Sequence, residues 1–360
     1  MRFDKICSSY FLKFAGFMEK ICNIVRSNDI KDLVGIIGDR QKVWMICDSN
    51  VWSSFACSIA VELGDRLLGK TLLEATEERK TFETVQEIIS AMLMAGADRN
   101  VFVLGIGGGI TTDISGFTAS IYKRGVRFAF VPTTLLAQVD AAIGGKNGVN
   151  FLSYKNMVGI IRQPEFTFIS STPLKTLPET EFREGLAELL KTFLIADAEA
   201  YREILSLIAD ARSNGLSLKD ISDRIEPYSA RAASIKADIV ARDPDEHGIR
   251  KVLNLGHTFA HAIEKLSAGA WSHGNAVAVG IVLAAELSEK VLDTEKALAE
   301  NIRKDFIAAG LPVECPYSLP EMADAMAKDK KAGGGQVAFI LLKRPGEVEI
   351  VPLDVARVCE

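Results

Sequence analysis

Short, continuous apolar runs alternate with helix-like segments in the first half of the chain, and this alternation constrains the fold most. The runs 43–47, 101–105 and 128–131 are partly β-branched and end at turn residues, as strands buried on both faces do. Between them, residues 81–95 carry apolar side chains at helical spacing. Because strands that alternate with helices form mostly parallel sheets, the sequence predicts a Rossmann-like α/β region.

The pattern changes after about Pro173, where amphipathic helical segments follow one another with hardly a strand between them. These segments span about 179–212, 217–241, 250–267, 274–291 and 294–309. One late apolar run, 337–342, is compatible with a final strand. A length of 360 residues suits two domains of about 150 residues or more. We therefore predict an α/β domain over 1–172, with 1–25 as an N-terminal extension, and an all-α domain over 173–360, with the active site in the cleft between them.

The composition excludes several function classes. The chain has 42 Lys and Arg against 47 Asp and Glu, and this acidic balance argues against nucleic acid or an anionic membrane as the main partner. No apolar run approaches the roughly 18 residues of a membrane helix. The six cysteines form no CxxC pair, so neither a disulfide framework nor a thiolate zinc site is indicated. We expect a cytoplasmic protein with reduced thiols.

A glycine-rich turn follows the second predicted strand. Residues 105–109 contain four glycines, and Thr111 to Asp113 open a predicted helix, so backbone N–H groups would lie at the positive end of a helix dipole, where phosphate binds. Ile110 departs from the strict dinucleotide fingerprint, and a tight packing turn is the other interpretation. Asp48 and Asn50, at the end of the first predicted strand, suit either ribose hydroxyls or a helix cap.

All four histidines fall within residues 247–273, which chance would rarely produce. On a single helix over 250–267, Arg250, Asn254, His257 and His261 would form one stripe opposite an apolar stripe. A solvated helix face more often carries Lys and Glu, so this stripe indicates ligand or metal chemistry. Neutral imidazole is a standard zinc ligand, and a site with three protein ligands keeps an open position for catalysis.

A further metal ligand must come from another segment. Glu188 and Lys191 lie three residues apart in an otherwise apolar helical stretch, so Glu188 is the best candidate, although a surface ion pair is the other interpretation. Thr258 follows His257 where a zinc protease would carry its general-base glutamate, which argues against a metalloprotease.

Several ordered motifs lie between about residues 40 and 345. They are the glycines at 107–109 with Asp113, the segment 123–125, the segment 132–137 with Asp140, the segments 144–146 and 148–150, the pair 155–156, Glu188 with Lys191, the segment 253–258 with His261, the pair 273–274, and the segment 329–331. Together they closely resemble the 3-dehydroquinate synthases, the shikimate-pathway members of the sugar-phosphate cyclases.

The resemblance implies an NAD- and zinc-dependent homodimeric enzyme, in which cobalt would satisfy the same ligands. Such an enzyme converts 3-deoxy-D-arabino-heptulosonate 7-phosphate into 3-dehydroquinate and phosphate. The cofactor transiently oxidises the C5 hydroxyl, phosphate is eliminated, the ketone is reduced back, and an intramolecular aldol reaction closes the ring. NAD is therefore regenerated in each turnover.

The resemblance also implies roles for individual residues. The zinc ligands correspond to Glu188, His257 and His273, which leaves His261 for the substrate phosphate or for proton transfer. The phosphate side corresponds to Lys146, Asn156, Arg124 from the other subunit, and Lys330 or Lys331. The substrate carboxylate corresponds to Lys236, Arg250 and Asn254, and the reacting hydroxyls to Lys191 and Asp140. The NAD positions correspond to Asp48, Asn50, Glu77, Lys80, Gly107, Gly108, Gly109, Asp113, Thr133, Thr134 and Lys155.

Some residues keep a second interpretation or depart from the family pattern. Asp113 would also serve as a charge at a helix start, and Lys236 as a solvated helix lysine. The stretch 151–154 replaces a His-Pro-x-Gly-like segment, and His247 is interpreted as a turn residue. Neither departure removes a catalytic group.

Three rival functions remain. Cyclases of sugar phosphates without a carboxylate share the cofactor and metal motifs, but Arg250, Asn254 and Lys236 favour a carboxylated substrate. A metal-dependent polyol or alcohol dehydrogenase would release NADH and would not need Lys146. A sensor that only binds NAD or metal would lack a catalytic group, and none is missing.

Overall fold

A computed structural model describes residues 23–38, 41–152, 154–327 and 336–359. Its centre in the first half is a six-stranded parallel sheet with the strand order β1-β8-β5-β4-β2-β3. The strands are β1 (Ile24–Arg26), β2 (Val43–Asp48), β3 (Leu67–Leu73), β4 (Phe102–Gly107), β5 (Arg127–Pro132) and β8 (Thr167–Ile169). The predicted strands at 43–47, 101–105 and 128–131 are thus confirmed as β2, β4 and β5.

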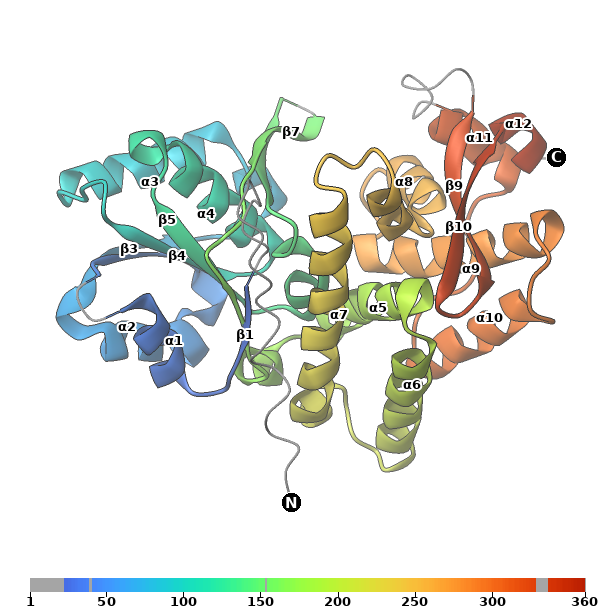
Figure 1. Cartoon of the computed structure of the whole chain (residues 1–360), viewed down its shortest axis with the longest axis horizontal. Coiled ribbons are helices and arrows are strands. Elements are labelled where there is room, and N and C mark those ends of the chain that lie inside the picture. Colours follow the sequence, from blue (N-terminus) through green and yellow to red (C-terminus); the bar gives the residue numbers. More distant parts are fainter. Residues whose placement is uncertain (1–22, 39–40, 153, 328–335, 360) are drawn as a thin grey trace.

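Helices cover both faces of this sheet (Figure 1). Helices α1 (Ile30–Ile37) and α2 (Cys57–Leu63) pack on one face, and α3 (Phe82–Met94) and α4 (Gly109–Ile121) on the other. Alternate residues of β2 enter the two cores: Val43 and Met45 contact the α1–α2 side, while Trp44 and Ile46 contact the α3–α4 side. Burial on both faces explains why the strand reads as a continuous apolar run.

The second half is helical, as predicted. It comprises α5 (Glu179–Ala196), α6 (Ala198–Ser213), α7 (Ser222–Arg242), α8 (His257–Leu266), α9 (His273–Val291), α10 (Leu298–Ala309), α11 (Leu319–Ala327) and α12 (Val355–Val358). An antiparallel hairpin, β9 (Val337–Arg344) and β10 (Glu347–Leu353), is added to the helices, so the region is not purely α. The late strand expected at 337–342 is confirmed by β9.

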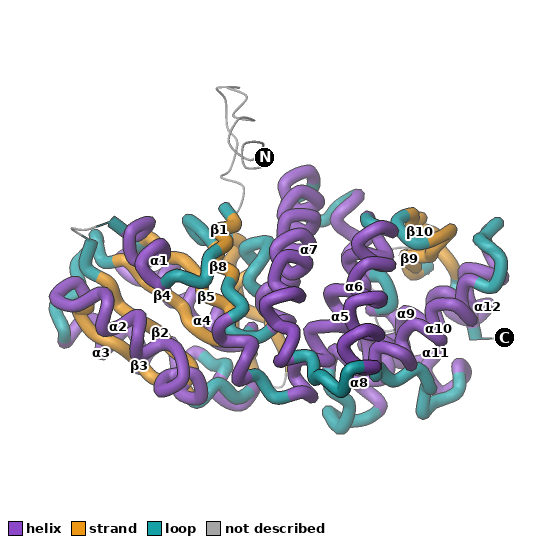
Figure 2. Tube along the Cα trace, turned by 90° about the horizontal axis from the view of Figure 1, so that it is seen from below, coloured by secondary structure: helices purple, strands orange, loops and turns teal. Residues whose placement is uncertain are grey.

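The two halves lie side by side, with α7 between the sheet and the remaining helices (Figure 2). Small side chains of α7, including Ala233 and Ala237, pack against Ile143 and Ile169 of the α/β half. A second hairpin, β6 (Lys146–Phe151) and β7 (Tyr154–Ile161), leaves the sheet and packs on α4, where Asn147 lies close to Gly116. Through these contacts the β6–β7 hairpin and the helical half come to line the same cavity.

Two predicted helices are broken. The segment 179–212 is interrupted at Asp197, whose extended φ of −154° ends α5 and whose carboxylate caps α6 by accepting from the Ala200 N–H. The single helix over 250–267 was wrong, because a 3-10 helix, Ile249–Asn254, ends before α8 begins at His257. Between them Gly256 has a φ of +77° and lies against α9, where a Cβ atom would approach the Ile281 nitrogen to 2.7 Å.

Candidate active site

A cavity of about 690 Å³ lies where the β6–β7 hairpin, the turn 137–141 and the helical half meet. Many of the predicted site residues line it: Asp113, Asp140, Lys146, Asn156, Lys191, Lys236, Arg250, Asn254 and His257. Arg250 and Asn254 come from the 3-10 helix, whereas His257 begins α8. The predicted helix was therefore wrong, yet the polar residues assigned to its stripe, apart from His261, still face one cavity.

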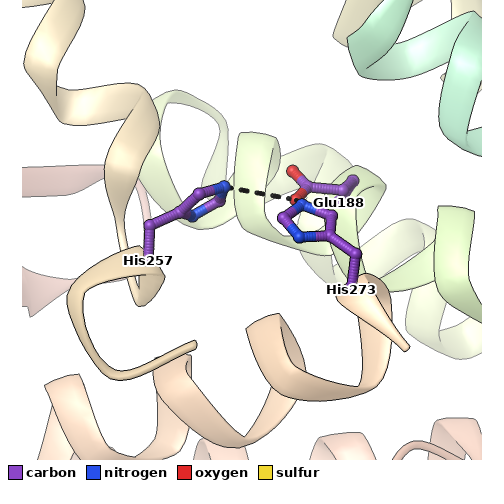
Figure 3. Close-up of side chains that lie close together, drawn as sticks. All are labelled: Glu188, His257 and His273. Atoms are coloured by element: carbon purple, nitrogen blue, oxygen red, sulfur yellow. Dashed lines mark ion pairs between the residues drawn. The ribbon is translucent and has the colours of Figure 1, made fainter. Parts of the chain in front are cut away.

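Three helices, α5, α8 and α9, meet at a compact cluster of metal-binding side chains. Glu188 of α5, His257 at the start of α8 and His273 at the start of α9 point toward one another (Figure 3), and their ligand atoms lie within 4.8 Å of one another. Glu188 Oε1 is 3.6 Å from Nε2 of His257 and 3.3 Å from Nε2 of His273.

The cluster fits a divalent cation. Glu188 is fully buried, and its Oε1 atom has no hydrogen-bond partner among the described residues. A buried carboxylate oxygen without a partner is costly unless a cation satisfies it, and two imidazole nitrogens complete a set of donors that zinc accepts. Three protein ligands leave a position open for a substrate oxygen.

Outer contacts orient both rings. His257 Nδ1 lies 3.2 Å from the Leu255 carbonyl oxygen, and His273 Nδ1 lies 3.3 Å from Glu264 Oε1. Each acceptor favours a proton on Nδ1 and so leaves Nε2 available to a metal. Glu264 was missed from the sequence, although it lies seven residues after His257, on the same face of α8.

The two histidines differ in their charge. Burial, assisted by the nearby Lys191, lowers the pKa of His257 to about 3. Burial also opposes the charged form of His273, but the carboxylates of Glu188 and Glu264, each 3.3 Å from one of its ring nitrogens, outweigh it and raise the pKa of His273 to about 10. In the absence of a metal, the surroundings therefore favour the neutral form of His257 and the charged form of His273.

Buried lysines surround the carboxylates of the cavity. Lys191 Nζ lies 2.5 Å from Glu188 Oε2 and 3.9 Å from Asp140 Oδ1. Lys236 Nζ lies 2.6 Å from Asp140 Oδ1 and also donates to the backbone oxygen of Asp140 at 2.9 Å. Both lysines are buried, so the interpretations of a surface ion pair at Glu188 and of a solvated Lys236 are wrong.

These lysine–carboxylate pairs determine the direction in which each group's pKa is shifted. Burial favours the neutral acids, but Lys191 and the two histidines hold the pKa of Glu188 well below its usual range, and Lys236 with Lys191 lowers that of Asp140. Burial lowers the pKa of Lys236 in spite of Asp140. For Lys191 the carboxylates outweigh burial, and its pKa is raised.

The cavity lining also includes Arg250, Asn254, Lys146 and one residue that the sequence did not reveal, Glu246. Arg250 is buried, and its guanidinium donates to the Pro244 carbonyl at 2.7 Å. Glu246 forms an ion pair with Lys146 and accepts a hydrogen bond from Asn254 Nδ2 at 3.1 Å. Nothing in the sequence distinguishes Glu246 from its neighbour in the same turn.

The predicted NAD segments lie at neighbouring strand ends. Asp48 ends β2, Gly107 ends β4, and Thr133 follows β5, and these three strands are adjacent in the sheet. The Thr133 N–H donates to the Gly107 carbonyl at 2.9 Å. Asp48 accepts from the Asn50 N–H at 2.9 Å, as a cap would. Carboxyl ends of parallel strands are where open α/β sheets bind ligands.

The glycine turn also has a packing role. Gly108 precedes α4, which begins at Gly109, so its backbone lies at the helix N-terminus. A Cβ atom on Gly107 would approach the Thr111 side chain to 2.6 Å, so the alternative of a tight packing turn holds for this glycine as well. The partly buried Thr134 accepts from the Ala137 N–H at 3.1 Å.

A polar network joins the remaining NAD positions to the hairpin. Lys80 donates to Asp113 Oδ2 and to Asn156 Oδ1, both at 2.5 Å. Asn150 donates to the Glu77 carboxylate at 2.7 Å and accepts from the Asn156 N–H at 2.9 Å. Burial raises the pKa of Asp113 to about 6, although Lys80 opposes the shift.

Some predicted site residues lie apart from the cavity. Arg124 is exposed, with a φ of +68°, in the turn after α4, and Lys155 is exposed on the hairpin. His261 is exposed, and the centre of its ring lies 5.5 Å from that of His257. His247 is exposed in a turn, as expected. Lys330 and Lys331 lie outside the described residues.

Among the described helices, none is both long enough and apolar enough to cross a membrane.

Comparison with known families gives a match over most of the chain. Residues 70–184 match the family described as 3-dehydroquinate synthase N-terminal, and residues 185–332 match 3-dehydroquinate synthase C-terminal. A 3-dehydroquinate synthase of Acidithiobacillus ferrooxidans (strain ATCC 53993 / BNL-5-31) is 39% identical over 339 residues, which cover 90% of this chain and 91% of the relative. One of Legionella pneumophila (strain Paris) is 36% identical over 318 residues, covering 88% and 85%.

Solved structures share the fold. A 2-epi-5-epi-valiolone synthase from Streptomyces hygroscopicus subsp. jinggangensis 5008, with NAD+ and Zn2+ bound, is 27% identical, with a TM-score of 0.80 over 96% of this chain and 97% of that chain. A 2-deoxy-scyllo-inosose synthase complexed with carbaglucose-6-phosphate, NAD+ and Co2+ has the same TM-score at 23% identity, over 95% and 96%.

Proposed function

The chain belongs to the 3-dehydroquinate synthase family, and we propose that it converts 3-deoxy-D-arabino-heptulosonate 7-phosphate into 3-dehydroquinate and inorganic phosphate, as an NAD- and zinc-dependent lyase. One observation carries this proposal. A cluster of metal ligands reaches a cavity through His257, and the lining of the same cavity includes the cations Lys146, Lys236 and Arg250. A phosphorylated sugar acid needs both a Lewis acid at a hydroxyl and cations at its two anionic ends.

The choice of a carboxylated substrate rests on the buried cations. Arg250 is 3% exposed, and among the described residues its guanidinium has only backbone carbonyl acceptors, from Pro244 and Gly144. A planar fork of donors suits a carboxylate. A sugar phosphate without a carboxylate would leave this buried cation without a hydrogen-bonded anion, which disfavours the rival cyclases.

The cofactors come from the site and from a relative. Zinc, or cobalt in its place, would be held by Glu188, His257 and His273 and would polarise a substrate hydroxyl, while NAD supplies the reversible oxidation. The 2-epi-5-epi-valiolone synthase with NAD+ and Zn2+ bound supports both assignments. The glycine turn 107–109 at the N-terminus of α4 is the part of the chain that we assign to the NAD phosphates.

The chain's own residues bind and orient the substrate. We assign Lys146 and Asn156 to the phosphate, and Arg250, Lys236 and Asn254 to the carboxylate. The Asp140 carboxylate, held between Lys236 and Lys191, is placed to accept a hydrogen bond from a substrate hydroxyl.

Binding and charge stabilisation, rather than a strong base, are what these residues supply. Each carboxylate among the described cavity-lining residues faces a lysine: Lys80 faces Asp113, Lys236 faces Asp140, and Lys146 faces Glu246. For Asp140 and Glu246 the paired lysine outweighs burial, holds the pKa of the carboxyl below its ordinary value and makes it a weaker base. For Asp113 burial prevails over Lys80 and raises the pKa to about 6.

Further parts of the proposal concern assembly and compartment. We assign residues 1–172 and 173–360 to two domains, and we propose a homodimer in which Arg124 serves the partner's phosphate site. The exposure of Arg124 outside the cavity supports this role, and the exposed side chains of Phe151, Leu152 and Tyr154 in the β6–β7 hairpin offer apolar surface to an interface. The free thiols of Cys47, Cys57, Cys315 and Cys359 agree with a reducing cytoplasm.

Metal analysis of two histidine variants tests the site. We expect His273→Ala to lose zinc and turnover together, because it removes one of three ligands. His247→Ala removes an exposed histidine of a turn and should keep both. Full zinc occupancy in purified His273→Ala would refute the assignment of the metal site.

A further inference from the structure

Glu246 connects the two halves of the molecule across the mouth of the cavity. It lies in the loop between α7 and the 3-10 helix 249–254, with a φ of +59°. One carboxylate oxygen pairs with Lys146, the first residue of the β6–β7 hairpin, and the other accepts from Asn254. The ion pair therefore joins residues 100 positions apart in the chain.

Lys146 differs from the other cations that line the cavity. Lys191, Lys236 and Arg250 are buried, whereas the Lys146 side chain is 61% exposed. Among the described lining cations, Lys146 is thus the one that an incoming anion meets first. Its ammonium is already neutralised by Glu246, and that carboxylate remains partly accessible at 28% exposure.

A phosphate dianion at Lys146 would stand beside the Glu246 carboxylate. Two anions at one ammonium repel each other, so the second can bind fully only when the first withdraws. Glu246 lies in a loop and not in a helix, and only one of its two carboxylate oxygens faces Lys146, so a rotation of its side chain is enough to release the ammonium.

We propose that Glu246 is a displaceable internal anion: it holds the Lys146 ammonium in the ligand-free enzyme, yields it to the phosphate group of the substrate, and reclaims it as inorganic phosphate leaves. This inference rests on the proposed role of Lys146 at the substrate phosphate. Glu246 is a positioning residue, since it acts on the reaction through Lys146. Because the Glu246 carboxylate competes with phosphate for the Lys146 ammonium, it weakens phosphate binding and favours the release of inorganic phosphate as product.

Calorimetric titration of the zinc- and NAD-loaded protein with inorganic phosphate tests the proposal. Glu246→Gln keeps the shape of the side chain and an acceptor for Asn254 but removes the charge, and it should bind phosphate about five-fold more tightly, the value of one exposed ion pair. Asp245→Asn removes the same charge from the neighbouring exposed residue, which does not line the cavity, and should leave the affinity unchanged.

The kinetic consequence separates this role from a structural one. In Glu246→Gln, product inhibition by phosphate should strengthen by the same factor as binding. A variant that was merely destabilised would bind phosphate less tightly. Glu246→Asn removes the same charge with a different side chain, and asparagine tolerates the positive φ of this position. This variant must also bind phosphate more tightly. Unchanged or weaker binding in both variants, or equal tightening in Asp245→Asn, would overturn the proposal.

Lys146→Met distinguishes failure of this inference from failure of the proposed function. We expect this variant to bind phosphate weakly, and Glu246→Gln to have no further effect in its background. If Lys146→Met leaves phosphate affinity intact, the phosphate role of Lys146 falls, and the displaceable anion falls with it. If Lys146→Met weakens binding while the Glu246 variants do not tighten it, only the inference about Glu246 is refuted.

Discussion

Gly256 sets the position of a metal ligand, and its replacement by alanine is the most informative perturbation of the fold. The residue has a φ of +77° and immediately precedes His257. A Cβ atom there would lie 2.7 Å from the Ile281 nitrogen and 2.8 Å from its Cγ1. Neither the backbone nor the core of α9 can move away freely, so Gly256→Ala displaces the start of α8 or the middle of α9.

The expected magnitude has two parts. An alanine in the left-handed region costs roughly 1–2 kcal/mol, and overpacking adds typically 1–3 kcal/mol, so the free energy of unfolding should fall by about 2–5 kcal/mol. Gly269→Ala is the matched control, because Gly269 has a φ of +88° but no atom within 4 Å of its Cβ position. That variant should lose only about 1–2 kcal/mol.

Denaturant unfolding of the metal-free variants measures both losses, and competition with a chromophoric chelator measures zinc affinity. We expect Gly256→Ala to lose zinc affinity as well as stability, because His257 moves with the start of α8, whereas Gly269→Ala should keep its affinity. Equal losses of stability in the two variants would refute the close approach of Gly256 to α9.

Three further predictions concern single side chains. Glu264→Gln should weaken zinc binding by about 10-fold or more, because Glu264 orients His273, and unchanged affinity in a chelator competition would contradict that role. Burial raises the pKa of Cys47 to about 12, so peptide mapping after a thiol reagent at pH 8 should find Cys57 modified and Cys47 intact; early labelling of Cys47 would contradict its burial. Arg250→Ala should raise KM far more than it lowers kcat, and an effect confined to kcat would exclude Arg250 from substrate capture.

The sequence predicted the strands whose two faces are both buried, because such strands are continuous apolar runs. It did not predict β1 and β8, which have three residues each, nor β3, an edge strand interrupted by polar residues. The hairpin β6–β7 was missed because β7 exposes its apolar side chains and so lacks the alternation of a half-buried strand. Periodicity also could not show the break at Gly256, which arises from a tertiary contact with α9.

The candidate site likewise contains residues that the local sequence indicates and contacts that only the fold reveals. Local spacing drew attention to the histidines and to Glu188, because these residue types are unusual at those positions. The pairing of Lys236 with Asp140 and of Lys146 with Glu246 joins distant segments, so only the fold reveals it. Glu264 had a local signal, its place on the His257 face of α8, which sequence reasoning did not use.

Product analysis tests the central claim most directly. The purified protein is incubated with zinc, NAD and 3-deoxy-D-arabino-heptulosonate 7-phosphate, phosphate release is followed, and the carbocycle is identified by mass and NMR. We predict stoichiometric phosphate and 3-dehydroquinate without net NADH. Absence of phosphate with this substrate, or NADH that accumulates with simple polyols, would contradict the proposed function.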